Sequence, residues 1–254
     1  MKVAVFGAAG WLGRAFLQNV AGQHEIRACD LGPQAWEAWN DIDGEWTDGE
    51  KVFGDIVDYQ AVDQALEGVD AVLHMILYQP PASLTPDQAN EKSILVYLKG
   101  LWNVLQAAQQ RSIKRVVHLG SCQTVHPDGV FFSSQVRRPD ASLYAMCKRL
   151  QEEMCRQFYD AYGLSVIVLR PDYIVDTRIG VGRGREKLEG QSIGWVCRHD
   201  LAQACRLALE TDTVEHDVLH VVGAPEAANH CNVDRTREVL GLEFKGEYDK
   251  FKKD

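Results

Sequence analysis

Short and almost uninterrupted apolar runs alternate with helix-like segments along most of this chain, and this alternation constrains the fold more than any other feature. Strands that are apolar at nearly consecutive positions are typical of a parallel sheet buried on both faces by helices. We therefore predict an α/β fold with a doubly wound parallel sheet. The predicted strands cover residues 2–8, 25–30, 51–56, 70–77, 115–121, 165–171 and 218–223, and the clearest helices cover residues 11–21, 58–67, 90–110, 142–162 and 200–210.

The chain is expected to form one compact unit with two parts. Its 254 residues, 46% of them hydrophobic and 25% charged, can bury a sizeable core. We assign residues 1–171 to the main core and residues 172–254 to a smaller, substrate-binding portion that returns to it. Residues 32–50 and 172–198 break the alternation, and long irregular segments inside a compact domain are often functional. The second segment is the better candidate for a lid over a substrate.

The overall charge and the N-terminus argue against several partners. The net charge is −9 and Lys and Arg form no cluster, so neither nucleic acid nor an anionic membrane is expected as a partner. Glycines interrupt the apolar run in MKVAVFGAAGWLG before it reaches the length of a signal peptide or a membrane span, which predicts a cytoplasmic protein. The seven cysteines form no CxxC pair, so we predict neither disulfides nor a metal site.

Three glycines mark the junction between the first predicted strand and the first predicted helix. Gly7, Gly10 and Gly13 form a GxxGxxG pattern, in which the backbone turns tightly and approaches a pyrophosphate at the helix N-terminus. Asp30 ends the second predicted strand, where a carboxylate accepts hydrogen bonds from the adenosine ribose and repels a 2′-phosphate. This arrangement predicts a dinucleotide site that prefers NAD to NADP.

Further residues of the predicted cofactor site lie in the same turn and at the ends of later strands. Asp55 ends the third predicted strand, where its side chain either meets the adenine amine or caps the helix predicted from residue 58. His74 and His118 lie within buried strands and are expected to be core residues with satisfied hydrogen bonds. We also assign to the walls of the cofactor site Trp11, Leu12, Ile56, His74 and Pro171.

A tyrosine and a lysine stand four residues apart on the helix predicted over residues 142–162. Side chains at this spacing share one face of a helix. An ammonium close to a phenol favours the phenolate and lowers the pKa of the tyrosine from about 10. Tyr144 is therefore a candidate general acid/base for a hydroxyl whose carbon exchanges hydride with a nicotinamide, and Lys148 would also hold the nicotinamide ribose.

The combined motifs resemble those of a known family. GAAGWLG, the acidic end of the second strand, GD at residues 54–55, YAMCK, LRP and RHDLAQA are similar in order and spacing to the extended short-chain dehydrogenase/reductases, the NAD-dependent epimerase/dehydratase group. The resemblance extends over nearly all of the chain. It implies a Rossmann fold, bound NAD, active-site roles for Tyr144 and Lys148, and often a homodimer packed through the helices at residues 90–110 and 142–162. CDLGP, GLWNVLQAA and the short C-terminal half look most like uronate dehydrogenases.

The chain departs from this family pattern at two positions. The fifth strand of the family ends in a Ser pair whose second member hydrogen-bonds the reacting oxygen, and this chain has Ser121 and Cys122 there. Because a thiol is a weak donor, either Ser121 serves, or Cys122 occupies that position, or Cys122 is only a packing residue. Tyr97 stands where the family usually has an Asn that steadies the site, so the local hydrogen-bond network is expected to differ.

The short C-terminal half favours a small substrate. Family members that act on nucleotide sugars usually have longer C-terminal portions, so a sugar-like molecule without a nucleotide fits better. Arg178, Arg183 and Arg185 lie in the irregular segment. A guanidinium there, with Arg178 and Arg183 preferred, would bind a carboxylate or phosphate, although any single loop arginine is more often simply solvated. His126 follows the turn at Ser121 and is a further candidate for contact with substrate.

These features together predict an NAD-dependent oxidoreductase that acts on a secondary hydroxyl of a sugar or sugar acid. Tyr144 would move the proton, Lys148 would assist it, and the nicotinamide would take the hydride. Two alternatives stay open. A sugar or nucleotide-sugar epimerase or dehydratase would use the same groups but retain its cofactor through the cycle, and a non-catalytic NAD-binding regulator would be compatible with Cys122 and Tyr97.

Overall fold

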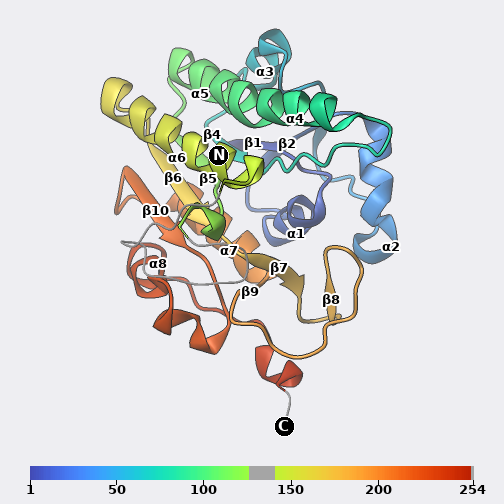
Figure 1. Ribbon diagram of the computed structural model, residues 1–254. Coiled ribbons are helices and arrows are strands. Elements are labelled where there is room, and N and C mark those ends of the chain that lie inside the picture. Colours follow the sequence, from blue (N-terminus) through green and yellow to red (C-terminus); the bar gives the residue numbers. More distant parts are fainter. Residues whose placement is uncertain (126–140, 253–254) are drawn as a thin grey trace.

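The computed structural model describes residues 1–125 and 141–252 and contains a seven-stranded main sheet (Figure 1). Its strands are β1 (Lys2–Phe6), β2 (Glu25–Asp30), β3 (Glu50–Phe53), β4 (Ala71–His74), β5 (Arg115–Leu119), β6 (Val166–Arg170) and β10 (His216–His220). Neighbouring strands are parallel, in the order β10-β6-β5-β4-β1-β2-β3. From β1 the chain adds β2 and β3 on one side, and it then adds β4 and the later strands on the other side of β1. Rossmann-type sheets bind their ligands at this switch point between β1 and β4.

The predicted helices are all present, and two short ones are additional. The α-helices in the described ranges are α1 (Trp11–Asn19), α2 (Asn40–Asp43), α3 (Tyr59–Ala65), α4 (Pro86–Ile94), α5 (Gly100–Gln110), α6 (Leu143–Tyr162), α7 (Arg198–Glu210) and α8 (Val233–Leu240). Of these, α2 and α8 were not predicted. Within the same ranges, no helix has the length and apolar character needed to cross a membrane.

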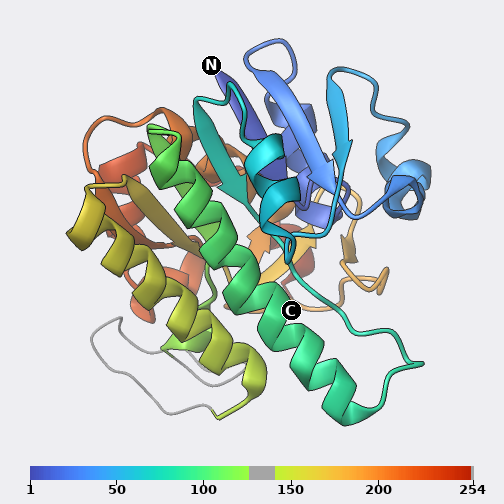
Figure 2. The same ribbon diagram turned by 90° about the horizontal axis from the view of Figure 1, so that it is seen from above.

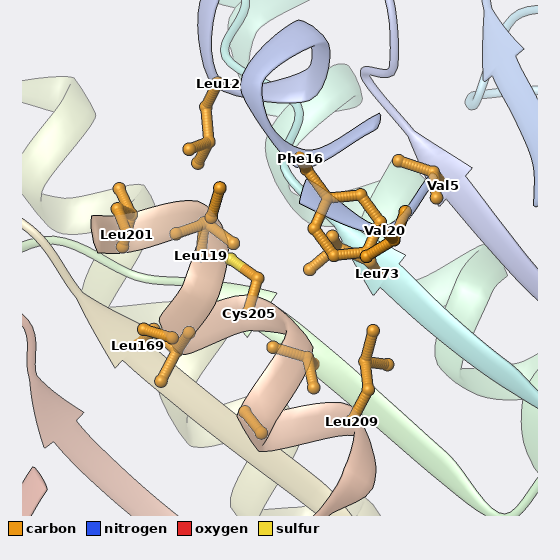
Figure 3. Packing of buried hydrophobic residues seen from close by; sticks show 14 of the residues in the cluster. Val5, Leu12, Phe16, Val20, Leu73, Leu119, Leu169, Leu201, Cys205 and Leu209 are labelled. Carbon is orange, nitrogen blue, oxygen red and sulfur yellow. The ribbon is translucent and has the colours of Figure 1, made fainter. Parts of the chain in front are cut away.

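Side chains alternate between the two faces of the main sheet and meet a different layer of helices on each face. Val5 and Leu73 point to the face covered by α1 and α7, where they pack with Phe16 of α1 and near Leu209 of α7 (Figure 3). The neighbouring positions, such as Val72, point to the opposite face, which α3, α5 and α6 cover. The predicted doubly wound α/β fold is therefore confirmed. Figure 2 shows α5 and α6 side by side along the outside of the molecule.

The helix predicted over residues 90–110 begins earlier and contains an irregular turn. Thr85 caps α4 in a capping box with Gln88. Residues Leu95–Lys99 form a π-helical turn, after which α5 continues in the same direction. Turns of this kind inside α-helices are frequent at functional sites. Here the turn contains Tyr97, whose side chain is buried against the core.

The segment over residues 172–198 forms a second sheet of three short strands. These strands are β7 (Tyr173–Asp176), β8 (Val181–Gly182) and β9 (Trp195–Cys197), in the order β8-β7-β9. The chain then returns to the main layers, because α7 packs beside α1 and β10 pairs with β6 at the edge of the main sheet. The elements α7 and β10 of the C-terminal portion are thus part of the main α/β core.

The acidic segment between β2 and β3 is helical rather than irregular. Residues Pro33–Trp39 form a 3₁₀ helix that leads directly into α2. The buried Arg14 of α1 donates to the Trp36 carbonyl (3.3 Å) and to the Asn40 side chain (3.2 Å). The Trp36 ring stacks on Trp46, with 5.3 Å between centroids. These contacts fix the segment against α1.

Candidate active site

The glycine turn between β1 and α1 has the geometry that its sequence predicts. Gly7 adopts a φ of 87°, in the left-handed region that favours glycine. A Cβ atom on Gly13 would lie 2.3 Å from the Gly7 carbonyl oxygen, so only glycine lets α1 pack this closely on the turn. The helix begins after Gly10 with no side-chain cap and no acidic residue in its first turn. Its N-terminal amides, including those of Trp11 and Leu12, are therefore suited to a pyrophosphate.

Asp30 is held against this turn at the end of β2. Its carboxylate accepts hydrogen bonds from the amides of Ala9 (3.0 Å) and Leu31 (2.9 Å). Burial raises the pKa of Asp30, and these two hydrogen bonds act in the opposite direction. Because amide donors fix its orientation while its remaining lone pairs can still accept, the carboxylate fits the ribose hydroxyls of an adenosine. The turn and Asp30 together fit NAD.

Asp55 does not cap the following helix. The cap of α3 is Asp58, whose carboxylate accepts from the amide of Gln60. Asp55 accepts instead from the ammonium of Lys92 (2.7 Å) and from the amide of Val57 (3.0 Å). Burial raises the pKa of Asp55, but the hydrogen bond from Lys92 and the other contacts outweigh burial and lower it overall. A small pocket beside it is lined by Phe6, Cys29, Val52, Gly54, Asp55, Ile56, Ala61, Val62 and Ala65.

Ser121, Tyr144 and Lys148 converge at the carboxyl end of β5. Ser142 caps α6, accepting from the amide of Ala145 (3.2 Å), and this places Tyr144 in the first turn of the helix. The Ser121 side chain acts on the phenol of Tyr144 as a hydrogen-bonding group that lowers its pKa. One turn further along α6, the buried Lys148 donates to the carbonyl of Leu119 (2.7 Å), with its Nζ 5.8 Å from the centroid of the Tyr144 ring. The predicted pair therefore shares one face and one site.

The predicted lowering of the Tyr144 pKa is wrong for this structure. Burial is the largest influence and raises the pKa of Tyr144, while the hydrogen bond from Ser121 and the charge of Arg183 act to lower it. Burial also lowers the pKa of Lys148, to about 8, and Glu152 opposes this shift. Burial, which the helical spacing does not reveal, is thus the largest influence on both pKa values.

Cys122 lies beside Ser121 in sequence, but its thiol is bonded to the backbone of β6. Its thiol donates to the carbonyl of Arg170 (3.3 Å) and is completely buried. It packs among apolar side chains that include Val222 and Cys231. Burial raises the pKa of Cys122 well above its ordinary value. Of the two candidates for the hydroxyl donor, only Ser121 therefore acts on Tyr144 through a hydrogen bond, since the Cys122 thiol donates to Arg170.

Tyr97 occupies the region where the family pattern has an Asn. Its ring meets that of Tyr144 edge to face, with 5.9 Å between centroids, and the Nζ of Lys148 lies 5.7 Å from its centroid. Its hydroxyl donates to the carbonyl of Tyr78 (3.0 Å), and its carbonyl accepts from the side chain of Gln151 (2.7 Å). The π-helical turn thus gives Lys148 a second aromatic neighbour besides Tyr144.

The three loop arginines have different surroundings. The charge of Arg183, whose side chain is exposed, acts to lower the pKa values of both Tyr144 and Tyr97. Arg178 contacts Asp176 and His199 instead. Arg185 is paired with Asp41 of α2 (2.6 Å), away from the tyrosines. Of the two arginines predicted to bind substrate, only Arg183 therefore has a charge that acts on Tyr144.

The remaining predicted residues are mostly structural in their contacts. His74 is buried, with its Nδ1 2.9 Å from the Nδ1 of His118, so it lies in the core rather than at a surface, and the charge of Lys148 acts to lower its pKa. The carbonyl of Pro171 accepts from the amide of Cys122 (2.9 Å) and supports the turn after β5. His126 lies outside the described residues.

Sequence reasoning missed a buried ion network next to the glycine turn. Arg198, at the start of α7, donates to Asp43 of α2 (2.7 and 2.8 Å) and to Asp176 of β7 (2.7 Å). Its guanidinium also lies 3.9 Å from the centroid of the Trp11 ring and 3.3 Å from the Trp11 carbonyl. The pKa of Asp176 is lowered, because hydrogen bonds from His199 and Arg198 outweigh its burial. In the sequence, the only feature that pointed to this network was the RHD at residues 198–200, where α7 begins.

Several known proteins are similar to this chain in sequence or in fold. Uronate dehydrogenase from Pseudomonas putida is 26% identical over 223 residues, covering 86% of this chain and 75% of the relative. L-arabinose 1-dehydrogenase (NAD(P)(+)) from Haloferax volcanii is 26% identical over 233 residues, 82% of either chain. A mutant uronate dehydrogenase from Agrobacterium tumefaciens, complexed with NAD, shares the fold with a TM-score of 0.74 at 21% identity, covering 98% of this chain and 86% of that one.

The match to a family model decides the classification. The model of the NAD dependent epimerase/dehydratase family matches residues 3–222, which include the glycine turn, Asp30 and the Tyr144–Lys148 pair. The chain therefore belongs to the NAD-dependent epimerase/dehydratase family and is an NAD-using enzyme of the dehydrogenase and epimerase type.

Proposed function

We propose that this enzyme oxidises a secondary hydroxyl of a sugar or sugar acid and transfers the hydride to NAD. The observation that carries the proposal is the convergence of Ser121, Tyr144 and Lys148 after β5. This group lies at the same edge of the sheet as the glycine turn, because β1, β4 and β5 are adjacent and parallel. The names of two sequence relatives, a uronate dehydrogenase and an L-arabinose 1-dehydrogenase, support a sugar-like substrate.

Each side chain has a separate task in this proposal. NAD, when bound, supplies the hydride acceptor. The phenolate of Tyr144 takes the proton of the substrate hydroxyl, while Ser121 hydrogen-bonds the same oxygen and holds it beside the phenol. Lys148 donates one N–H to the Leu119 carbonyl. Its other N–H groups bind the nicotinamide ribose, and its charge stabilises the phenolate.

A carboxylate on the substrate is favoured by Arg183. This arginine is exposed, and its charge acts on Tyr144. A guanidinium binds a carboxylate through two parallel hydrogen bonds, which would fix the orientation of a sugar acid relative to the phenol. Arg178 is excluded from this role because it is engaged with Asp176 and His199.

A substrate screen tests the proposed function. Hexuronic acids, their lactones and neutral aldoses are incubated with NAD, and the reduced cofactor is followed by its absorbance. We expect net formation of NADH with at least one sugar or sugar acid. The Tyr144→Phe variant should lose about 10²- to 10⁴-fold in kcat, the range for removal of a general acid/base. The matched control is Tyr162→Phe, at the exposed end of the same helix, which should keep full activity.

The same screen separates the alternatives. Interconversion of sugar epimers without net NADH would replace the dehydrogenase by an epimerase. A protein that binds NAD tightly, turns over none of the sugars and keeps its cellular effect in the Tyr144→Phe variant would be a regulator. Calorimetric titration with NAD accompanies each variant, so that loss of cofactor binding is distinguished from loss of chemistry.

We also propose that two copies of the chain associate through α4–α5 and α6. These helices lie side by side on the outside of the molecule (Figure 2). Their outer surface carries large apolar side chains that are between 42% and 58% exposed, namely Ile94, Trp102, Met146, Leu150 and Tyr162. An apolar surface of this kind on two adjacent helices is suited to a matching pair on a second copy. The cytoplasmic location stays a prediction from the sequence.

A further inference from the structure

Two histidines form a buried pair beneath the proposed catalytic lysine. His74 ends β4 and His118 lies opposite it in β5, in register. Their exposed fractions are 1% and 0%, and their Nδ1 atoms are 2.9 Å apart. Burial and the charge of Lys148 lower both pKa values, that of His74 to about 3, so both rings are neutral. A hydrogen bond between two Nδ1 atoms requires a proton on one of them and none on the other.

Gln151 of α6 determines which histidine carries that proton. The Gln151 Nε2 donates to the carbonyl of Tyr97 (2.7 Å), which fixes the amide orientation because a carbonyl can only accept. The Gln151 Oε1 therefore faces His118, whose pKa it acts to raise. Both this oxygen and the Nε2 of His118 are buried without a partner of good geometry among the described residues. Since the oxygen only accepts, His118 must carry a proton on Nε2 and none on Nδ1.

The opposite end of the pair then becomes an acceptor. With His118 unprotonated at Nδ1, His74 carries its proton on Nδ1 and has an unprotonated Nε2. That nitrogen is buried and unpartnered within the described part of the chain. The cation that acts on it is Lys148, which donates one of its three N–H groups to Leu119. A bare nitrogen stabilises a nearby ammonium, whereas an N–H group there would repel it.

The other ionisable groups around this site leave the arrangement intact. On α6, Glu152 forms a bidentate pair with Arg170 of β6 (2.8 and 2.6 Å). Cys147 and Cys155, also on α6, have raised pKa values and are neutral. The phenols of Tyr97 and Tyr144, which approach from the π-helical turn and from the start of α6, also have raised pKa values. Lys148 is therefore the cation that polarises the histidine pair.

We propose that His74, His118 and Gln151 form a one-way hydrogen-bond chain that ends on the Tyr97 carbonyl, and that the unprotonated His74 Nε2 at its other end stabilises the charge of Lys148. The donors all point away from the lysine: His74 Nδ1–H to His118, His118 Nε2–H to Gln151, and Gln151 Nε2–H to Tyr97. The role in turnover rests on the function proposed above for Lys148. The three side chains act through the lysine and are positioning residues.

Nitrogen NMR of the intact protein tests the chain without any substrate. Spectra that correlate ring nitrogens with ring carbon-bound protons distinguish the two neutral tautomers and the cation. We expect His74 protonated at Nδ1 and His118 protonated at Nε2, unchanged between pH 6 and 8. The His118→Asn and His74→Asn variants assign the signals. The reverse tautomers, or a cationic ring in this range, would overturn the proposal, whatever the enzyme's substrate.

The pH dependence of turnover tests the effect on Lys148. Replacing His118 by Phe removes the acceptor of His74, so His74 can place a proton on Nε2 towards the ammonium. The lysine then loses charge more readily and the phenolate forms less readily. We expect the rising limb of kcat/KM to move to higher pH by about one unit, which is about a tenfold loss at pH 7 that recovers on the alkaline side.

Two variants separate this effect from simple loss of packing. His118→Asn keeps an oxygen that can accept from His74 Nδ1 and should restore much of the profile. His220→Phe changes a histidine that is equally buried, in β10, and should lower stability without moving the profile. A His118→Phe profile that coincides with that of the natural protein, or a shift equally large in His220→Phe, would refute the positioning role.

Discussion

Lys148 carries its ammonium group into the interior of the protein, with only 3% of the side chain exposed. Burial lowers its pKa to about 8, and the nearby carboxylate of Glu152 opposes this without cancelling it. The lysine thus loses charge at mildly alkaline pH, whereas burial raises the pKa of the Tyr144 phenol above its ordinary value. Stabilisation of the phenolate by the charge of this lysine is therefore expected to weaken as the pH rises above about 8.

We expect the Lys148→Met variant to differ from the natural protein in how stability depends on pH. The pKa of Lys148 is about 8 in the folded protein and returns to its ordinary 10.5 on unfolding. Between these values the unfolded chain binds more protons, so the free energy of unfolding rises with pH in the natural protein relative to the variant. The relative rise is about 3 kcal/mol. Urea unfolding from pH 7 to 10.5 measures it, and parallel curves for the two proteins would contradict it.

The sequence predicted that Tyr144 and Lys148 share one site but did not predict the direction of the neighbouring turn. Tyr144 and Lys148 are four residues apart on a helix, so their common face follows from helical geometry. Whether Ser121 or Cys122 faces them depends on the path of the chain after β5. The Cys122 thiol finds its acceptor on Arg170, a residue of another strand. A contact between residues so distant in sequence has no local signal.

The junction of β1 and α1 shows how one residue determines the distance between two elements. A Cβ atom on Gly13 would lie 2.3 Å from the Gly7 carbonyl oxygen and 2.4 Å from that of Ala8. Both contacts are with backbone, which cannot move aside as a flexible side chain would. The helix would have to shift away from the strand, and its N-terminal amides would shift with it.

We expect Gly13→Ala to weaken both the fold and the binding of NAD. Overpacking of this kind costs about 1 to 3 kcal/mol in the free energy of unfolding, and the displaced amides should raise the Kd for NAD at least tenfold. Thermal unfolding and calorimetric titration measure the two effects. Gly22→Ala is the control, because Gly22 has a φ of 71° but no neighbour within 4 Å of a Cβ atom. It should lose stability while its affinity for NAD stays the same.

Element prediction succeeded where the hydrophobic pattern is continuous and failed where it is short or interrupted. The strands of the main sheet are apolar runs buried on both faces, and such runs have few alternative structures. By contrast, β8 has only the two residues Val181–Gly182. The π-helical turn at Leu95–Lys99 has the composition of an ordinary helix, so its extra residue leaves no mark in the sequence. The 3₁₀ helix and α2 depend on contacts with Arg14, far away along the chain.

At the scale of the whole molecule, Arg198 joins three regions that are distant in sequence. Asp43 comes from the segment after β2, Asp176 from the second sheet, and Arg198 from the start of α7. All three side chains are at most 1% exposed. A buried charge that loses its partner is strongly destabilising, whereas exposed pairs contribute little. The network therefore stabilises the arrangement of the regions around Trp11.

We expect Asp43→Asn to lower the free energy of unfolding by about 3 to 5 kcal/mol, because it leaves the buried Arg198 with one carboxylate fewer. The Kd for NAD should also rise, since Arg198 lies against Trp11 in the glycine turn. The matched control is Asp41→Asn, two residues earlier, which loses only the exposed pair with Arg185 and should cost less than about 1 kcal/mol. Denaturant unfolding of both variants, with and without NAD, checks the difference. Equal losses in the two would contradict the assignment.

The proposed homodimer gives a further prediction at this scale. Light scattering after size-exclusion chromatography should give twice the chain mass of 28.5 kDa for the natural protein. A charge at the centre of the apolar surface of α6, as in Leu150→Glu, should give the monomer. Ile179→Glu places the same charge on an equally exposed apolar residue outside these helices and should remain dimeric. A monomeric natural protein would rule out the association.

The packing of α7 against α1 has a consequence for folding of the chain during its synthesis on the ribosome. Phe16 and Val20 of α1 share their cluster with Leu201 and Leu209 of α7, which are synthesised almost two hundred residues later (Figure 3). A nascent chain that has emerged only as far as β6 therefore exposes the apolar residues of this cluster that α7 will later cover. We expect chaperones to bind the chain at that stage, because it exposes apolar surface. We also expect it to bind a dinucleotide only after α7 has been synthesised.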